Sequence, residues 1–90
     1  MKLSTKPKQK PDYYLEMMDG ELLLYHLDET KILYCNQTAS LIWYLCDGQR
    51  TVGQMIDILG DAYPEAAGTM ASDVEETIGQ FLATGCIELL

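Results

Sequence analysis

The chain has 90 residues, of which 48% are hydrophobic and 22% charged, a balance typical of one small folded domain. Four of its six cationic residues, Lys2, Lys6, Lys8 and Lys10, fall in the first ten positions, whereas residues 11–90 hold all 14 acidic residues. Because nucleic-acid binding draws its affinity from cations that neutralise phosphates, this acidic body disfavours it. The apolar runs are too short to cross a bilayer and no apolar stretch follows the N-terminal lysines, so we expect a cytoplasmic protein without a membrane partner.

The N-terminal segment differs in character from the rest of the chain. Residues 1–11 are basic and contain Pro7 and Pro11, and no apolar periodicity runs through them. We therefore expect a disordered basic tail over residues 1–11 and one folded domain over residues 12–90.

Three short strands are expected next. Residues 13–18 and 22–27 are rich in aromatic and long apolar side chains, and Asp19-Gly20 between them is a strong hairpin signal. Residues 31–35 form the third strand, and no strand signal follows directly. The pattern predicts an antiparallel meander with the third strand at an edge.

The apolar period changes to a helical one after these strands. Asn36 can cap a first helix that runs to about Cys46. The segment Thr51-Val52-Gly53-Gln54 has the form of a capping box, and it opens a second helix that Pro64 bounds.

A third helix is expected near the end of the chain. Ser72-Asp73-Val74-Glu75 offers another capping box, Gly85 stands where a C-terminal cap falls, and residues 86–90 suit a short extended segment. Together the elements predict an α+β fold of winged helix-turn-helix type, with a three-stranded antiparallel sheet followed by three helices.

The residues that usually carry chemistry are few. Cys35, Cys46 and Cys86 are too far apart for a zinc site and are best interpreted as reduced thiols in the core. His26, the only histidine, is interpreted as a surface or partly buried strand residue without a nucleophile to activate. We expect no metal, no cofactor and no enzymatic activity.

A nucleic-acid-binding regulator is the main alternative, because capped helices joined by a short turn also suit DNA binding. The second and third predicted helices contain no Lys or Arg, which counts against a recognition helix. A catalytic subunit is a further alternative, and it lacks a visible nucleophile, metal or cofactor constellation.

One stretch resembles a known family closely. Residues 36–52 read NQTASLIWYLCDGQRTV, which resembles the PqqD-like pattern Leu-Asn-x-Thr-Ala-x-x-Ile-Trp-x-Leu-x-Asp-Gly-x-x-Thr-Val. The later matches are Tyr63-Pro64, Asp73-Val74 and the run from Leu82 to Ile87. The likeness covers about residues 14–90 and departs at Cys35, where the family commonly has leucine.

The resemblance implies a recognition element for ribosomally made, post-translationally modified peptides. Such proteins bind the leader segment of a precursor peptide, without catalysis of their own, and hand it to a modifying enzyme that is often a radical SAM enzyme. The pathway can be pyrroloquinoline quinone (PQQ) synthesis or another peptide pathway. The protein can simply present the peptide, or it can also help to activate the modifying enzyme. It can be a monomer or a dimer.

The resemblance also implies where the leader lies, as an added strand on the edge of the third strand and against the third helix. An unpaired edge strand accommodates such a peptide through its free N–H and C=O groups. Ile42, Trp43 and Leu45 are interpreted as core. The candidate leader-binding residues are Lys31, Ile32, Leu33, Tyr34, Cys35, Asp73, Thr77, Gln80, Phe81 and Thr84. Phe81 fits the core equally, since it lies on the predicted apolar side of the third helix with Val74 and Ile78.

Overall fold

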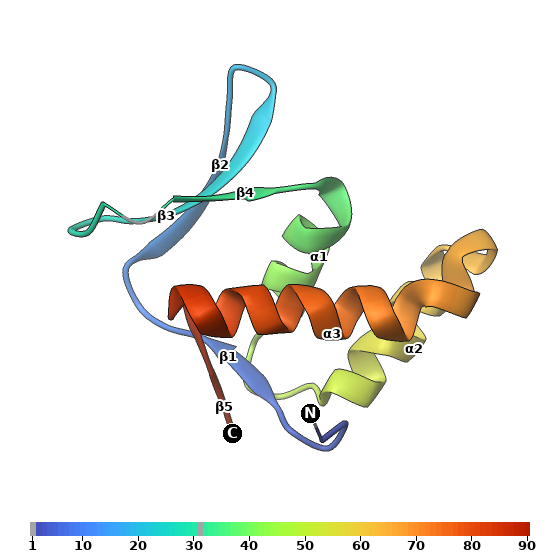
Figure 1. Ribbon diagram of the computed structural model, residues 1–90. Helices are drawn as coiled ribbons and strands as arrows, with labels where there is room; N and C mark the ends of the chain where they lie inside the picture. The colour runs from blue at the N-terminus through green and yellow to red at the C-terminus, as the bar shows by residue number, and fades with distance from the viewer. Residues whose placement is uncertain (1, 31) are drawn as a thin grey trace.

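A computed structural model describes residues 2–30 and 32–90, which fold into a mixed α+β domain (Figure 1). A two-stranded sheet lies beside the chain ends, and a three-stranded sheet and three helices make up the rest. The elements are β1 (Pro7–Gln9), β2 (Tyr13–Met18), β3 (Glu21–His26), β4 (Ile32–Cys35), α1 (Gln37–Leu45), α2 (Val52–Ala62), a 3-10 turn (Pro64–Ala66), α3 (Ala67–Thr84) and β5 (Ile87–Leu89).

The three-stranded sheet has the order β2-β3-β4, and both of its pairings are antiparallel. Asp19 and Gly20 join β2 to β3 with φ values of 53° and 81°, the two positive values that the tight hairpin turn requires. The register pairs Leu24 with Leu15 on one side and Leu33 on the other, so these side chains share the face toward the helices. The predicted meander with its third strand at an edge is confirmed.

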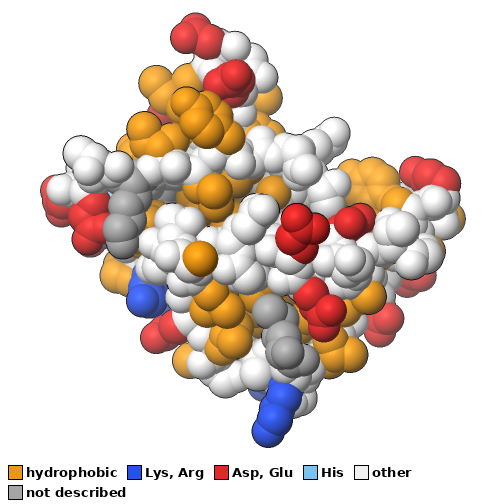
Figure 2. Space-filling model, viewed as in Figure 1, with side chains coloured by type: hydrophobic (Ala, Val, Ile, Leu, Met, Phe, Trp, Pro, Cys, Tyr) orange, Lys and Arg blue, Asp and Glu red, His pale blue; other side chains and the backbone are white. Residues whose placement is uncertain are grey.

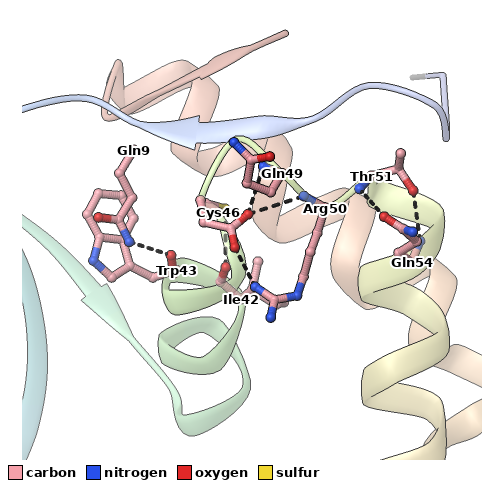
Figure 3. Close-up of polar contacts among 9 residues, drawn as sticks. Gln9, Ile42, Trp43, Cys46, Gln49, Arg50, Thr51 and Gln54 are labelled. Carbon is pink, nitrogen blue, oxygen red and sulfur yellow. Dashed lines mark hydrogen bonds and ion pairs between the residues drawn. The ribbon is translucent and has the colours of Figure 1, made fainter.

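The first two helices begin at the predicted caps. The Asn36 side chain accepts the N–H of Ala39 at 2.7 Å, and α1 starts at Gln37, directly after Asn36. Thr51 and Gln54 form a complete capping box at the start of α2, as Figure 3 shows. The sequence therefore predicts both helix starts correctly, because each depends on a local side-chain hydrogen bond.

The third helix begins earlier than predicted. Ser72-Asp73-Val74-Glu75 lies inside α3, which starts at Ala67 directly after the 3-10 turn opened by Pro64. Proline is favoured in a first helical turn, and Met70 extends the buried stripe one turn beyond Val74, so the helix gains packing by starting there. Gly85 ends α3 with a φ of 86°, as predicted for its C-terminal cap.

The N-terminal segment differs from the expected disordered tail over residues 1–11. Within it, β1 pairs with β5, and its other side meets the connection between α1 and α2. The Gln9 N–H donates to the Cys46 carbonyl at 3.0 Å, and the Gln9 side chain donates to the Trp43 carbonyl at 2.8 Å (Figure 3). Pro7 has no N–H, but it stands first in its strand, so the ladder loses no hydrogen bond there. Its ring is fully buried.

The core lies between the inner face of the three-stranded sheet and the helices. Trp43 and Phe81 pack edge to face with ring centroids 5.7 Å apart, and Leu24 is the sheet residue buried most deeply against them. Ile42 and Trp43 are buried and Leu45 is partly buried against them, which confirms their interpretation as core. The buried hydrophobic residues are Leu24, Ala39, Ile42, Trp43, Cys46, Val52, Met55, Leu59, Met70, Val74, Ile78, Phe81, Cys86 and Ile87.

Among residues 2–30 and 32–90, no helix combines the length and the apolar character that crossing a membrane requires.

Candidate functional site

A groove of about 780 Å³ lies between the three-stranded sheet and α3. Its floor and walls come from the β2–β3 hairpin, the end of β4, the start of α1 and the middle of α3. The lining residues are Met17, Gly20, Glu21, Leu22, Tyr34, Cys35, Asn36, Gln37, Thr38, Ala39, Asp73, Glu76, Thr77 and Gln80. Most of these side chains are polar, and none is Lys or Arg.

One rim of the groove is the free edge of β4. This strand pairs with β3 on one side, and along residues 32–35 no backbone hydrogen bond to another element is found on the other side. An unpaired edge presents a row of N–H and C=O groups that another extended chain can satisfy. The exposed edge and the groove lie next to each other, since Tyr34 and Cys35 belong to both.

The opposite wall is one face of α3. Asp73, Glu76, Thr77 and Gln80 follow one another at spacings of three, one and three, which places them on the same side of the helix. Thr77 is half-buried and the others are exposed. This wall is therefore formed by side chains that solvent or a ligand can reach.

The structure brings together half of the predicted site residues. Tyr34, Cys35, Asp73, Thr77 and Gln80 line the groove. Ile32 and Leu33 belong to the edge strand without lining the hollow, and Ile32 faces outward with 59% of its surface exposed. Lys31 lies outside the described residues.

Phe81 does not form part of the groove wall, which corrects its assignment as a candidate contact. Its side chain is fully buried and packs on Trp43, because residue 81 falls on the side of α3 that continues the stripe of Val74 and Ile78. Thr84, at the C-terminal end of α3, is half-buried and is not among the residues that line the groove.

Sequence reasoning missed the part of the groove that α1 and the hairpin supply. Asn36, Gln37 and Thr38 reach the groove because α1 begins directly after β4, and Glu21 reaches it because the hairpin turn stands beside that point. A signal was present for the first three, since the residues that follow an edge strand necessarily lie at its end. Glu76 also had a signal, because it lies three residues from Asp73 on a predicted helix.

Two of the cysteines and the histidine are buried or half-buried in the structure. Burial raises the pKa of the Cys46 thiol to about 12, and burial also raises the pKa of Cys35, which is half-buried at the groove. His26 is half-buried, accepts the Asp28 N–H at Nδ1 and packs its ring on Tyr13, as a partly buried strand residue is expected to. Within the part of the chain that the structure describes, no three His, Cys, Asp or Glu side chains gather as a metal site.

The groove and the open strand edge define a small α+β domain with a candidate binding surface at one edge of its sheet. The chain belongs to the family of coenzyme PQQ synthesis protein D (PqqD), whose family model matches residues 21–87. That match contains β3, β4 and all three helices, and with them most of the groove.

A curated relative agrees with this family. A protein of Rahnella aquatilis named "PqqA binding protein" is 36% identical over 62 residues, which cover 69% of this chain. The matched part spans 61% of the relative's own length. No solved structure matches the chain.

Proposed function

We propose that this protein binds the leader segment of a ribosomally made precursor peptide as an added strand on β4 and presents it to a separate modifying enzyme. The single observation that carries the proposal is the open edge of β4 beside the groove. The name of the Rahnella relative, which states that it binds PqqA, supports a precursor peptide as the ligand. A radical SAM enzyme as the partner, and a cytoplasmic location, are parts of the same proposal.

The length of the edge sets the scale of the interaction. Four residues of β4 span about 13 Å at roughly 3.3 Å per residue, enough to pair with a peptide segment of similar length. Each backbone hydrogen bond contributes about 0.5–1.5 kcal/mol net, so the strand pairing alone yields only a few kcal/mol. Micromolar binding needs about 8 kcal/mol, and the side-chain contacts with α3 and α1 supply the remainder.

We propose that the protein contributes binding and presentation, and no chemical step. The groove lining contains hydroxyls, amides and carboxylates, and His26, the chain's one histidine, is not among the lining residues. A thiol whose pKa is raised by burial, as for Cys35, is a weak nucleophile at neutral pH. The alternative of a nucleic-acid-binding regulator gains no support from the groove, where every charged side chain of the described residues is acidic.

Strand addition can be tested by blocking single amides of the peptide. The probe is the leader segment of the precursor encoded beside this gene, prepared as a series with one N-methylated residue at each position. Only every second residue of an added strand points its N–H toward β4, so about tenfold losses of affinity are expected at alternate positions. The intervening positions are the matched control.

Calorimetry of each peptide gives the outcome. An alternating profile supports pairing with the edge. Losses at consecutive positions, or no loss at any, contradict strand addition even if the peptide binds.

A further inference from the structure

We propose that the peptide taken by this groove is cationic on one face, with Lys or Arg at the positions that point toward α3. Bulky apolar residues occupy the alternate positions. The inference rests on the proposed function, since it assumes a strand added to β4, and it names the chemical class of the peptide that this site selects. The occupant is thus a short extended segment in which basic and apolar residues alternate.

The charge of the groove is the first observation. Glu21, Asp73 and Glu76 line it, and among residues 2–30 and 32–90 no cationic side chain does. Among the described residues none of the three carboxylates forms an ion pair; Asp73 accepts only the hydroxyl of Thr69, at 3.3 Å. Figure 2 shows acidic side chains gathered over α3 on the face that carries the groove, with the blue Lys and Arg side chains at the left edge and the bottom of the view.

The start of α1 opposes this charge only in part. Residues 37–39 bring the N-terminal end of the helix to the groove, and such an end carries roughly half a positive charge. The Asn36 side chain already accepts the Ala39 N–H, so one of the donors there is occupied. Three carboxylates outweigh this partial charge, and the groove favours a cationic ligand.

The spacing of the carboxylates suits a strand. Asp73 and Glu76 are three residues apart on α3, a separation of about 5–6 Å between their Cβ atoms. Side chains two residues apart in an extended peptide lie on one face and are about 6.6 Å apart. In Figure 1, β4 and α3 extend side by side across the view with opposite chain directions, so successive basic residues of an added strand would meet successive carboxylates.

The outer face of the sheet determines which side chains fit the alternate positions of the added peptide strand. Ile32 and Tyr34 alternate along β4 with the half-buried Leu33 and Cys35 and are 59% and 68% exposed, and Tyr34 also borders the groove. Leu23 and Tyr25, their neighbours on β3, continue the same apolar surface. A peptide strand beside β4 adds its own side chains to this row, and apolar residues there bury the exposed surface of Ile32 and Tyr34.

The test is a selection from random peptides, so it does not depend on which peptide is the natural ligand. A display library of random 12-residue peptides is panned against the wild-type protein and against the double variant Asp73→Asn/Glu76→Gln. The matched control is Asp57→Asn/Asp61→Asn, which makes the same change of net charge at exposed positions of α2 outside the groove. Circular dichroism melting verifies that all three proteins fold.

Wild type and the α2 control are expected to enrich peptides in which Lys or Arg recurs at every second position, and the groove variant is expected to lose that preference. One exposed ion pair contributes about 0.2–1 kcal/mol, so the loss of two should make a selected peptide bind the groove variant roughly 2- to 25-fold more weakly. The difference should shrink in about 0.5 M NaCl, where exposed charges are screened.

The outcomes separate this inference from the proposed function. Peptides that bind β4 without a basic preference, or an equal loss in the α2 control, overturn the charge claim and leave peptide binding intact. A selection that yields no groove binder from any of the three proteins overturns the proposed function itself.

Discussion

Two strands of this protein, β1 and β4, differ in how their edges are used. β1 has no strand signal in its sequence, yet both of its sides are occupied, by β5 and by the connection between α1 and α2. β4 has a strong strand signal, yet one side is left open beside a groove. Tertiary contacts on both sides stabilise β1 despite its weak sequence pattern. β4 has a strong pattern and keeps unpaired N–H and C=O groups on one side, to which a ligand can bind.

The largest expected effect tests whether β1 belongs to the folded unit. Deletion of residues 1–10 removes the β1–β5 ladder and the hydrogen bonds from this segment to Cys46, Gly48 and Val52. At about 1 kcal/mol for each bond we expect a loss of about 5 kcal/mol or more in the free energy of unfolding, measured by urea denaturation.

The matched control keeps the backbone and removes the charge. Replacing Lys6, Lys8 and Lys10 by Gln leaves the ladder in place and should cost less than about 1 kcal/mol. Equal stability of the truncated and full-length chains would show that residues 1–10 are a tail after all.

The next effect separates the core side of α3 from its groove side. Phe81→Ala empties a fully buried site and should destabilise the fold by about 3–5 kcal/mol. Gln80→Ala, one residue earlier and exposed, should change stability by less than about 0.5 kcal/mol and weaken leader binding. Chemical denaturation and a binding titration of both variants give the comparison, and a Phe81 variant of unchanged stability would refute the corrected assignment.

A smaller effect appears at alkaline pH. The pKa of Cys46 is raised from 9.0 to about 12 by burial, so the folded state holds a proton that the unfolded state releases above pH 9. The contribution of Cys46 is fully present below pH 9 and is lost as pH rises toward 12. Two pH units above 9 correspond to about 3 kcal/mol.

This pH dependence is measured as the free energy of unfolding at about pH 8 and about pH 11 for wild type and Cys46→Ala. The variant should start less stable and lose less on the alkaline side. Parallel losses in the two proteins would assign the alkaline loss to other groups, such as Tyr25, whose pKa is raised chiefly by a hydrogen bond with Glu16.

The sequence predicts those parts of the fold that depend on local chemistry. The Asp19-Gly20 turn, the Asn36 cap, the Thr51 capping box and the Gly85 cap each involve residues within a few positions of one another. β1 could not be predicted this way, because its partners are residues 46–48 and 87–89, which are distant in sequence. Its own residues also show no apolar alternation. Propensity alone cannot indicate a strand that tertiary contacts create.

The lining of the groove was predictable in part, whereas its role as a leader-binding site stays a prediction. The edge strand and the α3 positions 73, 77 and 80 follow from the family resemblance and the helical period. For Phe81 the sequence left two interpretations open, because it shares the predicted apolar side of the third helix with Val74 and Ile78, and its full burial decides for the core. The contribution of Glu21 depends on where the hairpin lies in space, which no local pattern encodes.

The most direct test of the central claim is a titration of the isotopically labelled protein with the leader segment of the precursor encoded beside its gene, followed by backbone amide NMR. Strand addition on β4 predicts saturable shifts concentrated at residues 32–38 and 73–80, with residues 52–62 of α2 unchanged. Absence of shifts at saturating peptide, or shifts confined to α2 and β1, would contradict the account.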